Sequence, residues 1–361
     1  EKLSGSVDVP PSKSYTHRAV ITASLSEGAS KIMNPLFSED TLATIDACKS
    51  LGVVINGEED VLIVNGTTNL KAPAKAINCR LSASTIRFMT AVASLAEGVT
   101  VLTGEQGLLK RPIGPLTKAL KQLNVKCKSS HGYPPVKVYG RSLLGGEASI
   151  VGDVSSQFIT GLLLACPLAK NDTHIKLLTP LESKPYVQLT LDILKRHGIA
   201  VEVLGDYQEY FIPSGQEYKS HNHKVVGDFS SAAFLMAAAA ITKSHINLKN
   251  LDTSITLPDI EIIKILQNMG AKVVGGEGLL EVFGGDLEGI DVDARNIPDL
   301  VPVCVVLACY AKGKTIIRNV ERLRIKESDR VESIVTELTK MDGKITCFQD
   351  RLMVEGPCKM K

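Results

Sequence analysis

The stretch SYTHRAVITASLSEGASKIMN, residues 14–34, joins a run of small and apolar residues to a glycine and then to a β-like tail. A helix that is apolar on most sides belongs in a protein interior. Glycine readily adopts the left-handed conformation in which many helices end. This stretch therefore predicts a buried helix that stops near Gly28 and is followed by a strand.

The same pattern recurs four more times in the 361 residues, at 84–104, 155–178, 230–248 and 298–319. The five helices stop 69 to 73 residues apart, at Gly28, Gly98, Asn171, Ser244 and Gly313. Self-similarity at a fixed period indicates that one structural unit is repeated.

A second, more amphipathic helix follows each buried one. Its predicted stops are 72 to 74 residues apart, at Gly52, Asn124, Gly198, Gly270 and Gly343. Strands and turns come next, so each unit is predicted as βαβαββ. A further stop is expected about 73 residues after Gly343, beyond Lys361, so either the architecture has five units or a sixth is missing here.

Composition narrows the class of protein. The chain is 44% hydrophobic and 22% charged, as in ordinary globular domains, and its length suits two domains. A net charge of +2 favours neither a nucleic-acid nor a membrane partner, and no apolar run reaches the roughly 18 residues of a membrane span. No signal peptide is visible, and the eight cysteines form no CxxC pair, so we expect a cytoplasmic protein with reduced, buried thiols. His221 and His223 have no further ligand at metal-binding spacing, so no metal site is predicted.

Cations and hydroxyl groups gather where the predicted helices begin. They are Lys13, Ser14 and Arg18 in unit one, Ser82, Ser84, Thr85, Arg87 and Arg111 in unit two, and Ser155, Ser156, Gln157 and Ser183–Tyr186 in unit three. A cation at a helix start is unfavourable unless an anion lies nearby, and free N–H groups there bind anions. Equivalent ends of repeated helices should lie side by side, which predicts a phosphate- or carboxylate-binding site. The alternative is that these groups are ordinary N-caps and surface cations.

Unit five differs because it adds carboxylates. Asp299 precedes its first helix, and RIKESDR, residues 324–330, precedes its second. The segment by itself is also compatible with a salt-bridged surface turn. Together with Asp299 it offers two carboxylates near cations, which suits proton transfer on an anionic substrate.

These motifs resemble one family, the 5-enolpyruvylshikimate-3-phosphate (EPSP) synthases, which are enolpyruvyl transferases. The matching segments, in the family's order, are PSKSYTHRA, STIR, KRPIG, GDVSSQF, SKPY, NIPD and RIKESDR. The resemblance implies an α/β (α+β) fold, a two-domain inside-out α/β barrel of repeated βαβαββ units. Residues 1–11 plus 226–361 would form one domain and residues 12–225 the other, with the ligands between domains that close on binding.

The resemblance also implies the reaction. The family transfers the enolpyruvyl group of phosphoenolpyruvate to the 5-hydroxyl of shikimate 3-phosphate and releases phosphate, in the shikimate pathway to chorismate and the aromatic amino acids. No cofactor or metal is implied, and the expected partners are these two small molecules, with a monomeric chain.

Site residues follow from the same resemblance, motif by motif. The implied catalytic residues are Asp299, Glu327, Lys13 and Lys326. Shikimate 3-phosphate would be bound by Lys13, Ser14, Arg18, Ser155, Ser156, Gln157, Ser183, Tyr186, Asp299 and Lys326. Phosphoenolpyruvate would be bound by Lys13, Ala83, Arg111, Gln157 and Arg330.

The chain departs from the family pattern in places. Ala83 stands where a glycine is usual, in a turn expected to line the phosphoenolpyruvate site that the herbicide glyphosate also occupies. Leu81 replaces a polar residue, and Arg322 replaces a frequent asparagine. The family's sixth unit, with further phosphoenolpyruvate-binding cations, has no counterpart up to Lys361.

Two other interpretations remain open at this stage. A transferase acting on UDP-N-acetylglucosamine has the same architecture, but it has a Lys–Asn opening and a loop cysteine where this chain has Lys13–Ser14 and GEQGLLKRP. A shortened relative that binds shikimate 3-phosphate without turnover is the non-catalytic alternative.

Overall fold

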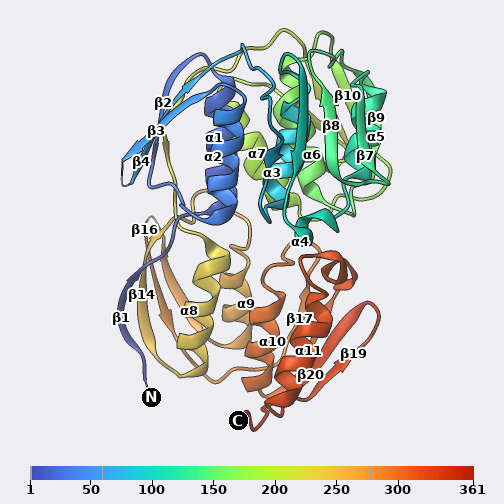
Figure 1. The fold of residues 1–361 in the computed structure, drawn as a ribbon. Helices are drawn as coiled ribbons and strands as arrows, with labels where there is room; N and C mark the ends of the chain where they lie inside the picture. Colours follow the sequence, from blue (N-terminus) through green and yellow to red (C-terminus); the bar gives the residue numbers. More distant parts are fainter. Residues whose placement is uncertain (1, 59, 277) are drawn as a thin grey trace. The chain divides into compact units, whose positions relative to one another are not determined.

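The computed structural model describes residues 2–58, 60–276 and 278–361. The chain divides into two compact units, Ser12–Val225 and Glu1–Pro11 with Val226–Lys361. Figure 1 labels many of the helices and strands of both units.

The Ser12–Val225 unit contains three repeats. Its elements in chain order are α1 (Lys13–Leu25), β2 (Gly28–Met33), α2 (Glu39–Ser50), β3 (Val54–Glu58), β4 (Val61–Gly66), β5 (Ile77–Asn78), α3 (Ala83–Val92), β6 (Val99–Thr103), α4 (Gln106–Leu109), α5 (Gly114–Gln122), β7 (Cys127–Ser130), β8 (Tyr133–Tyr139), β9 (Gly146–Ile150), α6 (Ser156–Ala165), a 3-10 turn (Cys166–Leu168), β10 (Thr173–Leu177), α7 (Lys184–Arg196), β11 (Glu202–Leu204), β12 (Glu209–Ile212) and β13 (His223–Lys224).

The second unit contains two repeats. Its elements are β1 (Ser4–Asp8), α8 (Phe229–Ile241), β14 (His245–Leu251), α9 (Ile262–Met269), β15 (Lys272–Gly276), β16 (Gly278–Phe283), β17 (Asp291–Asp293), α10 (Val301–Tyr310), β18 (Gly313–Arg318), a 3-10 turn (Glu321–Ile325), α11 (Arg330–Lys340), β19 (Ile345–Cys347) and β20 (Arg351–Gly356). The predicted α/β architecture of βαβαββ units is confirmed.

Every repeat forms a four-stranded sheet with the same strand order. The sheets are β13-β2-β4-β3, β5-β6-β8-β7, β9-β10-β12-β11, β1-β14-β16-β15 and β17-β18-β20-β19. In each, the first two strands are parallel and the other pairs are antiparallel. In repeats two, three and five the parallel pair is connected through the buried helix, which is the crossover that parallel strands require.

Two repeats exchange their first strands. β1 precedes α1 in the chain, yet it pairs in parallel with β14, for example Gly5 with Ile246. The strand that completes the first repeat is β13, in which His223 pairs with Ile32 of β2. Repeats one and four are therefore each assembled from two distant parts of the chain.

The first helix of each repeat forms the core. Every residue of α1 from Tyr15 to Leu25 is buried. Within the Ser12–Val225 unit α3 packs against α6 and α6 against α7, and in the other unit α8 packs against α10 (Figure 1). At Gly161 of α6 a Cβ atom would lie 2.9 Å from the carbonyl oxygen of Arg87 in α3. The absence of a side chain at Gly161 thus permits the close contact between α6 and α3.

The second helices end largely as predicted. Gly52, Asn124, Gly198 and Gly270 all have positive φ, between 67° and 106°. The prediction for Gly343 is wrong by one residue, because Asp342 has the positive φ of 67° there. Aspartate tolerates this conformation since its short side chain can hydrogen-bond locally.

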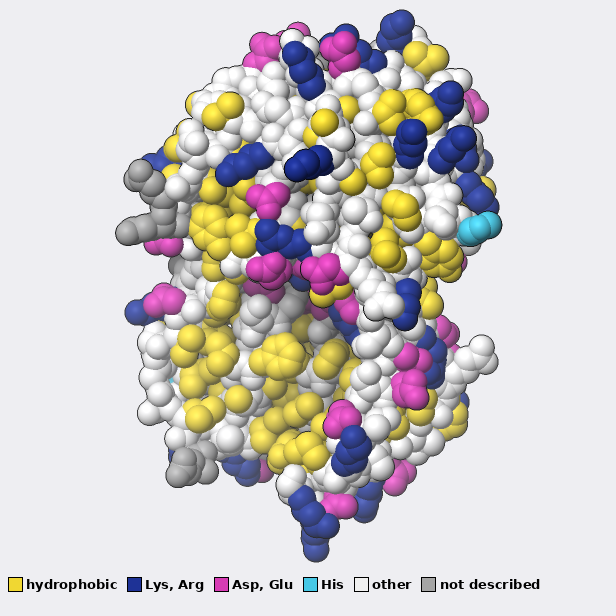
Figure 2. Space-filling model, viewed as in Figure 1, with side chains coloured by type: hydrophobic (Ala, Val, Ile, Leu, Met, Phe, Trp, Pro, Cys, Tyr) yellow, Lys and Arg dark blue, Asp and Glu magenta, His cyan; other side chains and the backbone are white. Residues whose placement is uncertain are grey.

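The surface carries charges of both signs. Figure 2 shows lysine and arginine side chains interspersed with acidic and apolar ones over the face in view. Seven of the eight thiols are buried and Cys347 is exposed. Among the described residues, none of the helices has the length and apolar character needed to cross a membrane.

Candidate active site

Arg18 lies in the interior of the Ser12–Val225 unit, where it connects α1 to α6 and α7. Its guanidinium donates to Thr190 Oγ1 at 2.8 Å, to Thr160 Oγ1 at 3.3 Å and to the Tyr186 carbonyl at 2.9 Å. Only 2% of the residue is exposed. Burial lowers the pKa of Arg18 to about 9, against an opposing effect of Tyr186, so the group remains cationic at neutral pH.

Arg87 makes the corresponding connection between α3 and the start of α6. It donates to Ser155 Oγ at 3.1 Å and to Gln157 Oε1 at 2.7 Å, and it lies 4.9 Å above the ring of Phe158. Gln157 in turn donates to Ser84 Oγ at 2.9 Å. The N-terminal ends of α3 and α6 therefore lie side by side, as the repeat predicts.

Hydroxyl groups at these helix starts serve as caps as well as predicted ligands. Ser12, rather than Ser14, caps α1, Ser82 caps α3 and Ser155 caps α6, each accepting a backbone N–H of its helix. Ser183, which precedes α7, has a left-handed φ of 58°, and its carbonyl accepts the Tyr186 N–H at 3.1 Å. A non-glycine residue held in this conformation is uncommon outside turns and functional sites.

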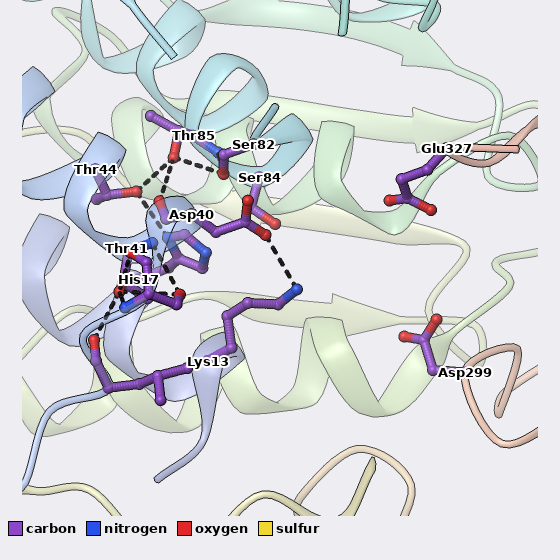
Figure 3. Close-up of polar contacts among 12 residues, drawn as sticks. Lys13, His17, Asp40, Thr41, Thr44, Ser82, Ser84, Thr85, Asp299 and Glu327 are labelled. Carbon is purple, nitrogen blue, oxygen red and sulfur yellow. Dashed lines mark hydrogen bonds and ion pairs between the residues drawn. The ribbon is translucent and has the colours of Figure 1, made fainter. Parts of the chain in front are cut away.

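Lys13, in the first turn of α1, is paired with a residue of α2. Figure 3 shows its ion pair with Asp40, in which Nζ lies 3.1 Å from Oδ2. About half of the lysine side chain remains exposed. The carboxylate therefore holds the ammonium group at the start of α1.

Ala83 is not in a tight turn, contrary to the expectation from sequence. It is the first residue of α3, directly after the cap Ser82, and has no positive φ. Only 5% of Ala83 is exposed, so its methyl group is packed against neighbours. Arg111 is also buried, in the segment between α4 and α5.

Asp299, Glu327 and Arg330 form a cluster in the other unit. Arg330 opens α11 and donates to Asp299 Oδ1 at 2.5 Å and to Glu327 Oε2 at 2.9 Å. Burial opposes the positive charge of Arg330, but the two carboxylates outweigh it and raise its pKa. Lys326 precedes Glu327, after the 3-10 turn. The three groups that sequence placed in two separate motifs thus lie together.

The structure adds residues that sequence analysis did not single out as site residues. They are Asp40, which pairs with Lys13, and Thr160 and Thr190, which accept from Arg18. His17 belongs with them, because it contacts Thr44 of α2. Nothing in the local pattern marks them, since their partners lie 27 to 172 residues away.

The repeated βαβαββ units, with buried arginines and hydroxyl groups at the helix starts, agree with the resemblance to the enolpyruvyl transferases. The family model described as EPSP synthase (3-phosphoshikimate 1-carboxyvinyltransferase) matches residues 1–361. The chain therefore belongs to the EPSP synthase family.

Individual relatives agree with this assignment. The chain is 45% identical over 357 residues to the 3-phosphoshikimate 1-carboxyvinyltransferase of Methanocella arvoryzae, covering 98% of this chain and 83% of that protein. It is 42% identical to the Methanocaldococcus jannaschii protein of the same name, covering 100% and 85%. The solved EPSP synthase of Acinetobacter baumannii superposes with a TM-score of 0.84 at 28% identity, over 99% of this chain and 83% of that one.

Proposed function

We propose that this chain is a 3-phosphoshikimate 1-carboxyvinyltransferase of the shikimate pathway. It transfers the enolpyruvyl group of phosphoenolpyruvate to the 5-hydroxyl of shikimate 3-phosphate and releases phosphate. The observation that carries this function is family membership along all 361 residues, with the charged segments PSKSYTHRA, KRPIG and RIKESDR present.

Shikimate 3-phosphate is assigned to groups at the starts of α1, α6 and α7. These are Lys13, Ser14, Arg18, Ser155, Ser156, Gln157, Ser183 and Tyr186, together with Asp299 and Lys326. The network around Arg18 and Arg87 supports the assignment, because its hydrogen bonds fix the helix starts that carry the proposed ligands before an anion arrives. Arginine also suits phosphate better than lysine, since its planar donors can form two parallel hydrogen bonds.

Phosphoenolpyruvate is assigned to Lys13, Ala83, Gln157, Arg111 and Arg330. Protonation of its methylene carbon by Glu327 develops positive character at the neighbouring carbon, which the 5-hydroxyl then attacks as Asp299 accepts the hydroxyl proton. A tetrahedral intermediate results, and phosphate leaves as a proton is removed from the same methyl carbon. Lys13 and Lys326 offset the negative charge of the two substrates.

The direct test is phosphate release by the complete natural polypeptide. We expect release only when both substrates are present, with an enolpyruvyl ether as the organic product. Binding of shikimate 3-phosphate without release would identify the non-catalytic alternative, and turnover with UDP-N-acetylglucosamine would identify the related transferase. Size-exclusion chromatography with light scattering tests our further proposal that the chain is monomeric.

Substitutions at the proposed shikimate 3-phosphate ligands should weaken binding of that substrate. Arg18→Lys keeps the charge but removes the planar donors, and we expect a loss of tenfold or more, as for a charge-assisted contact worth roughly 1.5–3 kcal/mol. Ser156→Ala should cost a few-fold. Calorimetric titration measures both.

The matched control for this pair is Ser94→Ala. Ser94 is fully buried, but its hydroxyl donates to the Ala91 carbonyl of its own chain segment. Its removal should leave affinity for shikimate 3-phosphate unchanged. Wild-type affinity in both Arg18→Lys and Ser156→Ala would contradict the assignment of this pocket.

Ala83→Gly should make the enzyme more sensitive to glyphosate, which we assign to the phosphoenolpyruvate site. Glyphosate is longer than phosphoenolpyruvate, so the buried methyl group of Ala83 should penalise it more. Overpacking of this kind typically costs about 1–3 kcal/mol, or roughly ten- to a hundredfold in affinity. The measurement is the ratio of the glyphosate inhibition constant to the Michaelis constant for phosphoenolpyruvate. An unchanged ratio would mean that Ala83 does not contact the inhibitor.

A further inference from the structure

A series of buried, hydrogen-bonded side chains links α1, α2 and α3 near their N-terminal ends. His17 Nδ1 lies 2.7 Å from Thr44 Oγ1, and Thr44 Oγ1 lies 2.7 Å from Thr85 Oγ1. Thr85 Oγ1 also lies 2.8 Å from Ser82 Oγ, the N-cap of α3. All four residues are at most 1% exposed. Figure 3 shows their side chains. We call His17, Thr44, Thr85 and Ser82 the hydroxyl chain.

The hydroxyl chain joins the α2 turn that holds Lys13. Thr85 Oγ1 lies 3.2 Å from the Asp40 carbonyl oxygen, while the Asp40 carboxylate pairs with Lys13. Just before α3, Arg80 pairs with Glu39 at 2.6 Å, a second connection to the start of α2. The starts of α1 and α3 are therefore both fixed to the first turn of α2 (Figure 3).

The first turn of α3 is held from its other side as well. Ser84 accepts a hydrogen bond from Gln157 of α6 at 2.9 Å. Ala83 lies between the cap Ser82 and Ser84, so its position depends on the hydroxyl chain on one side and on α6 on the other. A change in either of these two contacts would therefore move Ala83 relative to Lys13.

Burying His17 at this position carries a cost in free energy. Within the described residues its Nε2 atom has no hydrogen-bond partner. Leaving a buried polar atom unsatisfied typically costs about 1–3 kcal/mol. Burial first, and then Lys13 and Arg18, lower the pKa of His17 well below its ordinary value, so the imidazole is neutral and adds no charge to this cationic region. An apolar residue would fill the same space without this cost, so the Nδ1 contact to Thr44 is the feature to be explained.

We propose that His17 is a positioning residue for phosphoenolpyruvate, which sets the first turn of α3 relative to Lys13 through Thr44 and Thr85. The inference rests on the proposed function, because Lys13 and Ala83 are assigned there to phosphoenolpyruvate. In this proposal, His17 contacts neither substrate directly. The affinity for shikimate 3-phosphate should not change when His17 is substituted, because Arg18 is held by its own contacts to α6 and α7.

Paired variants separate this contact from simple core packing. Asparagine places its amide near the position of the imidazole Nδ1, whereas the longer glutamine places it near Nε2. We expect His17→Gln to raise the Michaelis constant for phosphoenolpyruvate about tenfold and His17→Asn to stay within about threefold of wild type. Thr44→Val breaks the same contact from α2 and should match His17→Gln, while Thr44→Ser should match His17→Asn.

The matched control is Thr90→Val in α3. Thr90 is fully buried, and its hydroxyl donates to the Ile86 carbonyl of its own helix at 2.6 Å, outside the hydroxyl chain. The Michaelis constant for phosphoenolpyruvate should not change in Thr90→Val. Calorimetric affinity for shikimate 3-phosphate should be the same in all five variants, and thermal unfolding checks that each one folds.

The outcomes distinguish the two proposals. If His17→Gln does not fold, the Thr44 pair reports on the same contact. Equal Michaelis constants within each pair, or a parallel loss of shikimate 3-phosphate affinity, would overturn the positioning role while leaving the proposed function intact. A folded wild-type polypeptide that releases no phosphate would overturn the proposed function, and the positioning role with it.

Discussion

Glu327→Gln is expected to lower turnover about a hundredfold or more while leaving the affinity for shikimate 3-phosphate close to wild type. A positioned general acid typically contributes a factor of 10² to 10⁴, and glutamine keeps the shape of glutamate but cannot donate a carboxylic proton. Asp299→Asn should also lose rate, since the amide is a poor base. Steady-state phosphate release and calorimetry measure the two quantities separately.

The competing explanation is that Glu327 is only one partner of a surface ion pair. Its side chain is 56% exposed and bonds Arg330 three residues later. Such a pair contributes at most about 1 kcal/mol to the free energy of unfolding, and its loss would leave turnover nearly normal.

Glu337→Gln is the matched control for this prediction. Glu337 lies in α11 and forms an equally spaced ion pair with Lys340 at 2.7 Å. The two substitutions therefore make the same chemical change in the same kind of pair. Similar turnover in Glu327→Gln and Glu337→Gln would rule out a catalytic role for Glu327.

Acidification below about pH 6.5 is expected to destabilise the Ser12–Val225 unit through two buried histidines. His197 Nδ1 lies 2.7 Å from the Lys219 carbonyl, which can only accept, so this nitrogen carries the proton. His197 Nε2 must then accept from His223 Nε2, 2.9 Å away. His223 Nδ1 is left to accept from the Tyr15 hydroxyl at 3.2 Å. All three bonds form with both imidazoles neutral.

The pKa values of both histidines agree with this arrangement. Burial is the main cause that lowers the pKa of His197 to about 4 and that of His223 to about 3, and the nearby His221 lowers both further. Arg196 adds to the effect on His223. An unfolded histidine has a pKa near 6.5. Because the folded pKa is the lower one, the stabilisation is fully present above about pH 6.5 and is lost as the pH falls toward 4 and then 3.

The expected size follows from the shift of His197 alone. At 1.36 kcal/mol per pKa unit, the free energy of unfolding should fall by about 3 kcal/mol across this range. Urea denaturation at a series of pH values measures it. His223→Gln should make the pH dependence smaller without abolishing it, because His197 stays buried. His131→Gln, at an exposed turn position, should leave the pH dependence unchanged. Equal slopes in wild type and His223→Gln would contradict the role of this pair.

Sequence alone predicted much of the fold because its main signals are local. The apolar first helix of each repeat and the left-handed residues at Gly52, Asn124, Gly198 and Gly270 depend on neighbours within one or two helical turns. The period of about 70 residues is the recurrence of these local signals along the chain. The left-handed residue that ends the last of these helices is Asp342 and not the predicted Gly343. Both residue types tolerate positive φ, so the local sequence does not distinguish them.

The candidate site was predictable as residue types but not as contacts. Periodicity placed Arg18 and Arg87 at equivalent helix starts, and the resemblance supplied the expected roles. Local pattern does not reveal that Arg18 is satisfied by Thr160 and Thr190, or that Arg330 joins Asp299 to Glu327. These bonds depend on distances between segments that come together only after folding.

By itself, the sequence determined the repeated unit, its buried and exposed helices and the charged groups at their starts, because hydrophobic period and helix-stop chemistry act over short stretches. Only the tertiary structure decided which strand completes each repeat. β1 pairs with β14, some 240 residues away, and β13 returns to pair with β2. Backbone hydrogen bonds between strands are nearly independent of side-chain identity, so one parallel strand can replace another, and the choice is made by how the whole chain packs.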